Sequence, residues 1–162
     1  MKFQETHTLN KGMATVLKMY TDPKYFEAKY AKLGHSNVRI VNSGMNGDVF
    51  TILVEYETKP TIKLPSFAEK FVSGTMKIKQ TDSWNVKTAT GSLAVDIAGM
   101  PTKVSANMKL TDKGDSTSLA LDYEVNVKIP LIGGKLESVI ADDVKSKSPE
   151  DTRVSNELLA GY

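Results

Sequence analysis

The chain has no cysteine, little arginine and histidine, and no long apolar run. Without cysteine, disulfide frameworks, thiolate zinc sites, iron–sulfur clusters and cysteine nucleophiles are excluded. Only Arg39 and Arg153 are arginines, whereas proteins that read nucleic acids depend on arginine for bidentate contacts. The 21 basic and 19 acidic residues leave a net charge of +2. The chain also lacks a basic stripe, so we expect no nucleic-acid partner.

Membrane and metal signals are also missing. No apolar run approaches the ~18 residues that indicate a membrane-spanning helix. The segment from Met1 to His7 has no apolar core of the kind that a secretory signal carries. We therefore expect a cytoplasmic protein without integral membrane association. His7 and His35 have no partners at ligand spacing, so we expect no metal site and no cofactor.

The chain does have the length and apolar content of a folded domain. It contains 162 residues, and domains typically contain about 100–200. Leucine, isoleucine, valine and phenylalanine make up about a quarter of it, which is more than disordered chains usually contain. We see no linker or repeat and predict a single domain spanning residues 1–162. Nothing in the sequence indicates its oligomeric state.

The first third of the chain predicts one strand followed by two short helices. From Phe3 to Leu9, one set of residues alternates with another, as in a strand: Phe3, Glu5, His7 and Leu9 against Gln4, Thr6 and Thr8. Asn10 is a candidate N-cap for a helix that ends at Tyr20. Asp22-Pro23 combines an N-cap residue with proline at the first helical position, and this second helix should end at Gly34.

From Asn37 to Ile129 the hydrophobic period changes to two. This segment predicts about six antiparallel strands, with Asn46-Gly47 and Lys113-Gly114-Asp115 as tight turns. One face of each strand is apolar and the other is polar, so one face of the sheet should be covered and the other solvated. His35 precedes these strands in a loop, where we expect it to be exposed.

The last segment supplies the cover for the sheet. Apolar residues from Leu136 to Val144 follow helical spacing after Gly133-Gly134. Proline inside a helix removes a hydrogen bond and clashes with the preceding turn. Pro149 therefore predicts a long terminal helix that is kinked or broken near Ser146–Ser148. A curved sheet wrapped over this helix predicts an α+β fold with an apolar pocket between the two.

Inward-facing polar residues are the first candidates for a site in this pocket. His7 is in phase with Phe3 and Leu9. It is either an acid–base group or ligand anchor, or a histidine that bonds a neighbour such as Glu5 or reaches solvent. The strand pattern also predicts that four further polar or aromatic residues face inward: Tyr56, Gln80, Trp84 and Tyr123. These either orient a ligand or form ordinary local hydrogen bonds, because an unpaired buried polar group costs about 1–3 kcal/mol.

Apolar candidates complete the predicted site. Phe67 and Phe71 lie one turn apart in a short helix within residues 64–72, which serves either as a lid or as a connector. Met76 and Met108 are either an adaptable pocket wall or core filler. The full predicted ligand-binding set is His7, Tyr56, Phe67, Phe71, Met76, Ile78, Gln80, Trp84, Val95, Met108, Leu121, Tyr123, Val139 and Ile140. We expect no catalytic residue among them, because no nucleophile-elbow or phosphate-loop pattern is present.

Several short motifs carry a resemblance to a known superfamily. They are Met1-Lys2-Phe3 with Thr6-His7, Asp22-Pro23 with Tyr25-Phe26, Leu64-Pro65 with Lys70-Phe71-Val72, Thr81-Asp82-Ser83-Trp84, Gly99-Met100-Pro101, and the run from Lys128 to Glu137. Together they span nearly the whole chain. In these motifs the chain resembles the START-like superfamily, also called Bet v 1-like or SRPBCC. It is similar within that superfamily to an uncharacterised bacterial domain family. Pro149 and Asp82 depart from the family pattern, which would continue its helix at the first and have glutamate at the second.

The resemblance implies a helix-grip fold: a curved antiparallel sheet of about six or seven strands over the C-terminal helix. Gly133-Gly134 would be the hinge between strand and helix. It also implies a cavity for a hydrophobic small molecule or lipid, and it carries over no catalytic residue. Fold alone does not fix function, so three hypotheses stay open. They are a non-enzymatic carrier, a cyclase-type or hydrolase-type enzyme using His7, Tyr56 or Tyr123, and a protein-interaction module with a filled core.

Overall fold

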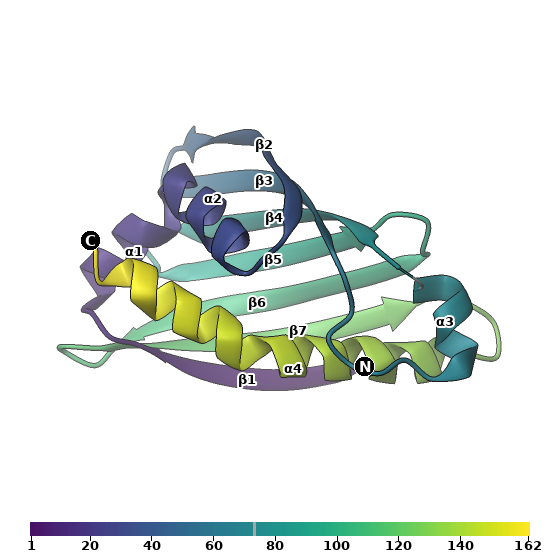
Figure 1. The fold of residues 1–162 in the computed structure, drawn as a ribbon. Helices are drawn as coiled ribbons and strands as arrows, with labels where there is room; N and C mark the ends of the chain where they lie inside the picture. The colour runs from purple at the N-terminus through teal and green to yellow at the C-terminus, as the bar shows by residue number, and fades with distance from the viewer. Residues whose placement is uncertain (73) are drawn as a thin grey trace.

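The computed structural model describes residues 1–72 and 74–162, which form seven strands and four helices. Their bounds are β1 Lys2–Leu9, α1 Met13–Tyr20, α2 Pro23–Lys32, β2 Ser36–Asn46, β3 Val49–Thr58, α3 Ser66–Val72, β4 Met76–Asn85, β5 Thr90–Ile97, β6 Thr102–Asp112, β7 Thr117–Val127 and α4 Gly133–Leu159. The predicted α+β helix-grip architecture is confirmed, with the two short helices placed directly after the first strand (Figure 1).

All seven strands belong to one antiparallel sheet in the order β1-β7-β6-β5-β4-β3-β2. The sheet curves around α4, while α2 lies against β2 and β3 and α1 lies beside the C-terminal end of α4 (Figure 1). Gly47 has a φ of +59° in the turn between β2 and β3, which explains why Asn-Gly stands there. Successive side chains of a strand point to opposite faces, so every second residue of β3 to β7 points into the concave side of the sheet.

The two short helices begin in different ways. The Asp22 carboxylate accepts a hydrogen bond from the Lys24 backbone amide at 3.0 Å, as predicted for the start of α2. The predicted Asn10 cap is wrong, because α1 begins at Met13 with Gly12 as its N-cap and no side-chain cap. Asn10 instead donates its backbone N–H to the Asn156 side chain at 2.8 Å. Its position is thus set by α4 rather than by α1.

Helix α4 starts against the sheet and runs without a break. A Cβ on Gly133 would lie 2.5 Å from the Val127 carbonyl oxygen, so only glycine fits this close approach. The sequence predicted a kink or a break near Ser146–Ser148; the break does not occur, because Pro149 lies inside a continuous helix. The two halves of α4 do run in different directions (Figure 1), as expected where proline removes a hydrogen bond. No helix in the described ranges is both long and apolar enough to cross a membrane.

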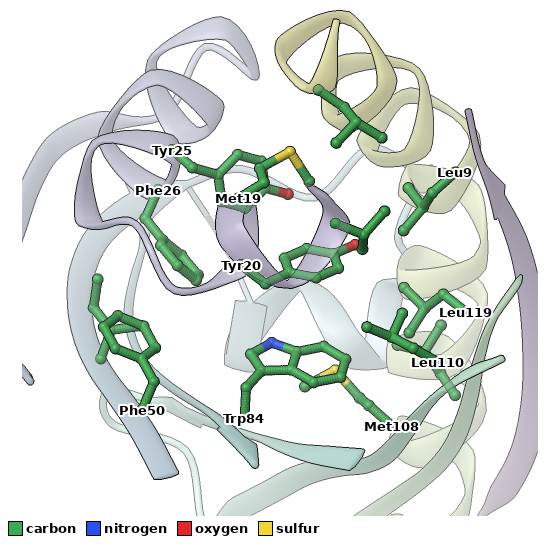
Figure 2. Close-up of a cluster of buried hydrophobic side chains, with 14 of the residues drawn as sticks. Leu9, Met19, Tyr20, Tyr25, Phe26, Phe50, Trp84, Met108, Leu110 and Leu119 are labelled. Carbon is green, nitrogen blue, oxygen red and sulfur yellow. The ribbon is translucent and has the colours of Figure 1, made fainter. Parts of the chain in front are cut away.

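Buried side chains form two clusters at opposite ends of the strands. The first joins α1 and α2 to the sheet, where the Tyr20 ring stacks on Trp84 with centroids 5.0 Å apart (Figure 2). The second joins α3 and the start of α4 to the ends of β6 and β7, with Val125 and Leu136 fully buried. Anchoring α4 at both ends leaves its middle to face the concave centre of the sheet.

Candidate ligand-binding site

A cavity of about 780 Å³ lies between the sheet and the middle of α4. Pockets for small organic molecules span roughly 300–1,000 Å³, and this volume lies within that range. Eleven of the fourteen residues in the predicted ligand-binding set line it. They are His7, Tyr56, Met76, Ile78, Gln80, Trp84, Val95, Met108, Leu121, Tyr123 and Ile140.

Three residues of the predicted set lie elsewhere. Phe67 and Phe71 belong to α3, which packs through Ala68 and Val72 on the second cluster and does not line the cavity. The Phe71 side chain is 38% exposed, with the Lys70 ammonium 5.2 Å from its ring centre. Val139 packs in the second cluster, one residue before the cavity-lining Ile140. In this placement α3 is a connector that closes the end of the sheet.

His7 reaches the cavity beside two oxygen atoms. Its Nε2 lies 3.1 Å from the Ser148 hydroxyl and 3.5 Å from a Glu5 carboxylate oxygen. A catalytic Ser-His-acid triad needs the acid on the opposite ring nitrogen from the serine. Here both groups meet the same nitrogen, so the geometry is that of a local hydrogen-bond cluster joining β1 to α4.

A chain of polar groups crosses the cavity wall on β3 and β4. The Tyr56 hydroxyl donates to Gln80 Oε1 at 2.9 Å, and Gln80 Nε2 donates to Asp82 Oδ2 at 2.9 Å. Asp82 is only 7% exposed. Burial raises the pKa of Asp82 to about 6, although the Lys29 charge and the Gln80 hydrogen bond act to lower it. The cavity thus contains a carboxyl group that titrates near neutral pH.

Helix α2 and helix α4 contribute an ion pair to the same cavity. Lys29 Nζ lies 3.0 Å from Asp151 Oδ1, and the lysine side chain is only 14% exposed. The same ammonium lies 5.8 Å from the ring centres of Tyr25 and Tyr30. Burial lowers the pKa of Lys29, but the charge and hydrogen bond of Asp151, together with the effects of Tyr20 and Asp82, outweigh burial, so the net shift is upward. Lys29 therefore stays protonated and paired.

Aromatic rings line the cavity next to this pair. Tyr56 stacks on both Tyr30 and His35, with centroids 4.5 and 4.7 Å from its own, and the Tyr30 and His35 centroids are 5.7 Å apart. The expectation that His35 is exposed is wrong: it is half-buried, because its ring covers Tyr56. Burial lowers the pKa of His35 to about 4, and the Lys147 charge acts in the same direction. The buried Tyr30 hydroxyl has no hydrogen-bond partner among the described residues.

The connection from β3 to α3 is tied to α4 at the rim of the cavity, where Thr61 is exposed. The backbone N–H and the hydroxyl of Thr61 donate to Asp143 Oδ1 at 2.7 and 2.9 Å. Lys147 Nζ binds the other oxygen of Asp143 at 2.6 Å. This connection crosses α4 (Figure 1), so the Thr61–Asp143 contacts hold one side of the rim closed.

The sequence reasoning missed Lys29, Tyr30, Asp82 and Asp151 as site residues. Two signals point to them in retrospect. Asp82 shares the inward phase of Gln80 and Trp84 on β4. Lys29 and Tyr30 stand four residues after Tyr25 and Phe26, so these four residues share one face of α2. Within residues 1–72 and 74–162, no group of three or more metal-ligating side chains is found.

Solved structures share this fold at low sequence identity. The Zhui aromatase/cyclase from Streptomyces sp. R1128 matches with a TM-score of 0.67 at 9% identity, over 99% of this chain and 93% of that one. Ara h 8.0201 matches at 0.66 and 14% identity, over 100% and 99%. A START superfamily protein from Mycobacterium smegmatis matches at 0.60 and 13% identity, over 99% and 97%. At these identities the likeness establishes the START-like fold alone.

No curated protein matches this chain. A family pattern described as "Protein of unknown function (DUF2505)" does match it, over residues 4–159. The match takes in every strand and every helix described above apart from the first two residues of β1. It agrees with the expected resemblance to an uncharacterised domain family of this fold. The chain therefore belongs to the DUF2505 family and has the START-like, Bet v 1-like fold.

Proposed function

We propose that this protein binds a hydrophobic small molecule or lipid in the cavity between the sheet and α4, and that it carries this ligand in the cytoplasm without chemically changing it. The observation that carries the proposal is the cavity itself, about 780 Å³ in volume. Its lining includes aliphatic side chains from β5, β6, β7 and α4, such as Val95, Met108, Leu121 and Ile140. Such a surface favours an apolar occupant, because each Å² of apolar area removed from water contributes about 25 cal/mol.

The proposal is tested by filling the cavity from two strands. Val95→Trp combined with Leu121→Trp places two indole rings inside it, since both residues line the cavity. Ala94→Trp combined with Asp122→Trp places the same rings on the outer face of β5 and β7, where both residues are exposed. The affinity for the neutral dye N-phenyl-1-naphthylamine should fall at least threefold in the inner variant, Val95→Trp with Leu121→Trp. It should stay within twofold of the wild-type value in the outer variant, Ala94→Trp with Asp122→Trp. Equal binding by the wild type and both variants would contradict the proposal.

An enzyme of the cyclase or hydrolase type is the second candidate, favoured by one observation. Asp82 titrates near neutral pH inside the cavity, and a general acid or base works best when its pKa lies near the operating pH. Turnover of a candidate substrate that disappears in Asp82→Asn or His7→Ala, with binding retained, would favour this alternative. The third hypothesis, an interaction module with a filled core, receives no support from a cavity of this size.

A further inference from the structure

We infer that the ligand carries a protonated amine, and that this ammonium group binds Asp82 while the apolar remainder lies against β5, β6, β7 and α4. This inference rests on the proposed binding function and names the chemical class of ligand for that cavity. It follows from the charges inside the cavity, from the aromatic rings around Asp82, and from one unpaired hydroxyl group.

The charge of Asp82 has no direct counterpart. Gln80 Nε2 is its one hydrogen-bond donor among the described residues, and none of their lysines or arginines forms an ion pair with it. The Lys29 charge acts to lower the pKa of Asp82, but Lys29 is already paired with Asp151 at 3.0 Å. An ionised carboxylate removed from water costs free energy unless a cation or several donors satisfy it. A ligand ammonium group would supply the missing charge.

The groups that face Asp82 allow such a cation. Lys29 on α2 and Asp151 on α4 are the charged groups whose fields reach it, and they have opposite signs. His35, whose ring stacks on Tyr56, has a pKa of about 4 and is neutral at pH 7. His7 on β1 bonds Ser148, and Lys147 on α4 is paired with Asp143. Above its pKa, Asp82 is therefore an acidic group of the cavity for which no ion pair is found among the described residues.

The rings around this carboxyl also favour a cation. The Asp82 charge contributes to the raised pKa of five tyrosines that line the cavity, namely Tyr20, Tyr25, Tyr30, Tyr56 and Tyr123. Asp82 is thus within electrostatic reach of their hydroxyl groups, and the rings that carry these groups line the same cavity, where aromatic faces attract organic cations. Lys29 already uses this attraction, since its ammonium lies over the Tyr25 and Tyr30 rings.

The Tyr30 hydroxyl gives an independent indication of a polar ligand group. It is buried, lines the cavity and has no partner among the described residues. A phenol oxygen can accept a hydrogen bond, and an ammonium group has three donors and no acceptor. An ammonium group bound at Asp82 therefore keeps further donors for other oxygens that line the cavity. A carboxylate ligand would instead place two like charges together at Asp82.

The test compares three ligands that differ only in their polar end. Decylamine, decanol and decanoate compete at pH 7.5 with N-phenyl-1-naphthylamine, a neutral fluorescent reporter, for wild type, Asp82→Asn and Asp122→Asn. We expect decylamine to displace the reporter at about tenfold lower concentration than decanol, because hydrogen bonds to charged groups are the stronger ones. The preference should fall below twofold in Asp82→Asn. It should persist in Asp122→Asn, whose carboxylate lies on the exposed outer face of β7.

The outcomes separate this inference from the function on which it rests. Reporter binding with no preference for decylamine, or a preference that survives in a folded Asp82→Asn variant, would overturn the ammonium assignment alone. Tighter binding of decanoate than of decylamine would also overturn the ammonium assignment. If the reporter does not bind and none of the three compounds raises the melting temperature, the carrier function fails as well. Thermal unfolding of each variant identifies loss of fold as a separate cause of lost binding.

Discussion

Trp84 lies directly opposite Gly91 in the pairing of β4 with β5, and its indole ring occupies the space above the glycine. A Cβ on Gly91 would lie 2.9 Å from two ring carbons of Trp84 and 2.5 Å from the Ser83 carbonyl oxygen. Trp84 is almost fully buried and stacks on Tyr20 (Figure 2). The absence of a side chain at Gly91 thus lets one ring join the sheet to α1 and line the cavity.

Gly91→Ala should therefore destabilise the protein by about 1–3 kcal/mol, the usual cost of forcing extra atoms into a tightly packed site. Chemical denaturation measures this loss. Gly44→Ala is the matched control, because a Cβ there meets nothing within 4 Å in the exposed strand β2. A Gly91→Ala variant as stable as Gly44→Ala would contradict the described packing of Trp84.

Asp82 should make stability fall as pH rises. Its folded pKa of about 6 lies above the ordinary value of 3.8, so between pH 4 and 6 the folded state binds more protons than the unfolded state. The cost of ionising the buried group grows through this window and is constant above it, reaching on the order of 3 kcal/mol. Asp82→Asn should be more stable than wild type at pH 7, with the difference shrinking toward pH 4. Denaturant melts at both pH values measure this, and a constant difference would contradict the burial of Asp82.

His35 should act in the opposite direction. Its folded pKa of about 4 lies below the ordinary 6.5, so the unfolded state binds more protons between these values and stability falls with falling pH. His35→Phe keeps a ring to stack on Tyr56 but removes the titration. The variant should lose less stability than wild type between pH 6.5 and 4. Parallel losses in the two proteins would show that the His35 ring is solvated.

The Lys29–Asp151 pair should show coupling. Asp151→Asn leaves a largely buried ammonium without its partner, which we expect to cost about 1–3 kcal/mol, less than for a fully buried pair because Asp151 is partly exposed. Lys29→Met combined with Asp151→Asn should recover part of this loss. A double-mutant cycle measures the coupling free energy, and a value near zero would mean that the two charges act independently.

The Thr61–Asp143 contacts should control access to the cavity. Asp143→Ala removes the acceptor for two donors of Thr61 and the partner of Lys147. Because Asp143 lies at the rim, the reporter dye should dissociate several-fold faster while its affinity changes less. Stopped-flow fluorescence measures the rate. The control is Val144→Ala, at the next residue of α4. It alters the cavity wall and should change the affinity for the dye more than the dissociation rate of the dye.

The strand pattern was the most informative signal in the sequence. Because side chains alternate across a sheet, the period of two placed Tyr56, Gln80, Trp84 and Tyr123 on the concave side, and all four line the cavity. The pattern does not reveal which face of α2 meets the sheet, so Lys29 and Tyr30 were missed. Asp82 was missed because a charged residue in a strand usually faces solvent. Here burial raises its pKa instead.

Local signals failed where tertiary contacts dominate. Pro149 predicted a kinked or broken helix; α4 is not broken and continues through the proline, because Val154 and Leu159 are buried beyond it. Their packing outweighs one lost backbone hydrogen bond. His35 follows a glycine in a loop, which favours exposure, but stacking on Tyr56 covers it. Neither contact is visible in the local sequence, because each joins residues that are distant along the chain.

Mass spectrometry of the freshly purified protein, first under native conditions and then after organic extraction, tests the central claim most directly. We expect the native mass to exceed the mass of the chain by that of one bound molecule. Extraction should release an apolar or amphipathic compound in stoichiometric amount. The inner variant Val95→Trp with Leu121→Trp should carry less of it. Protein that is empty under native conditions, and that also fails to bind the reporter dye, would contradict the account.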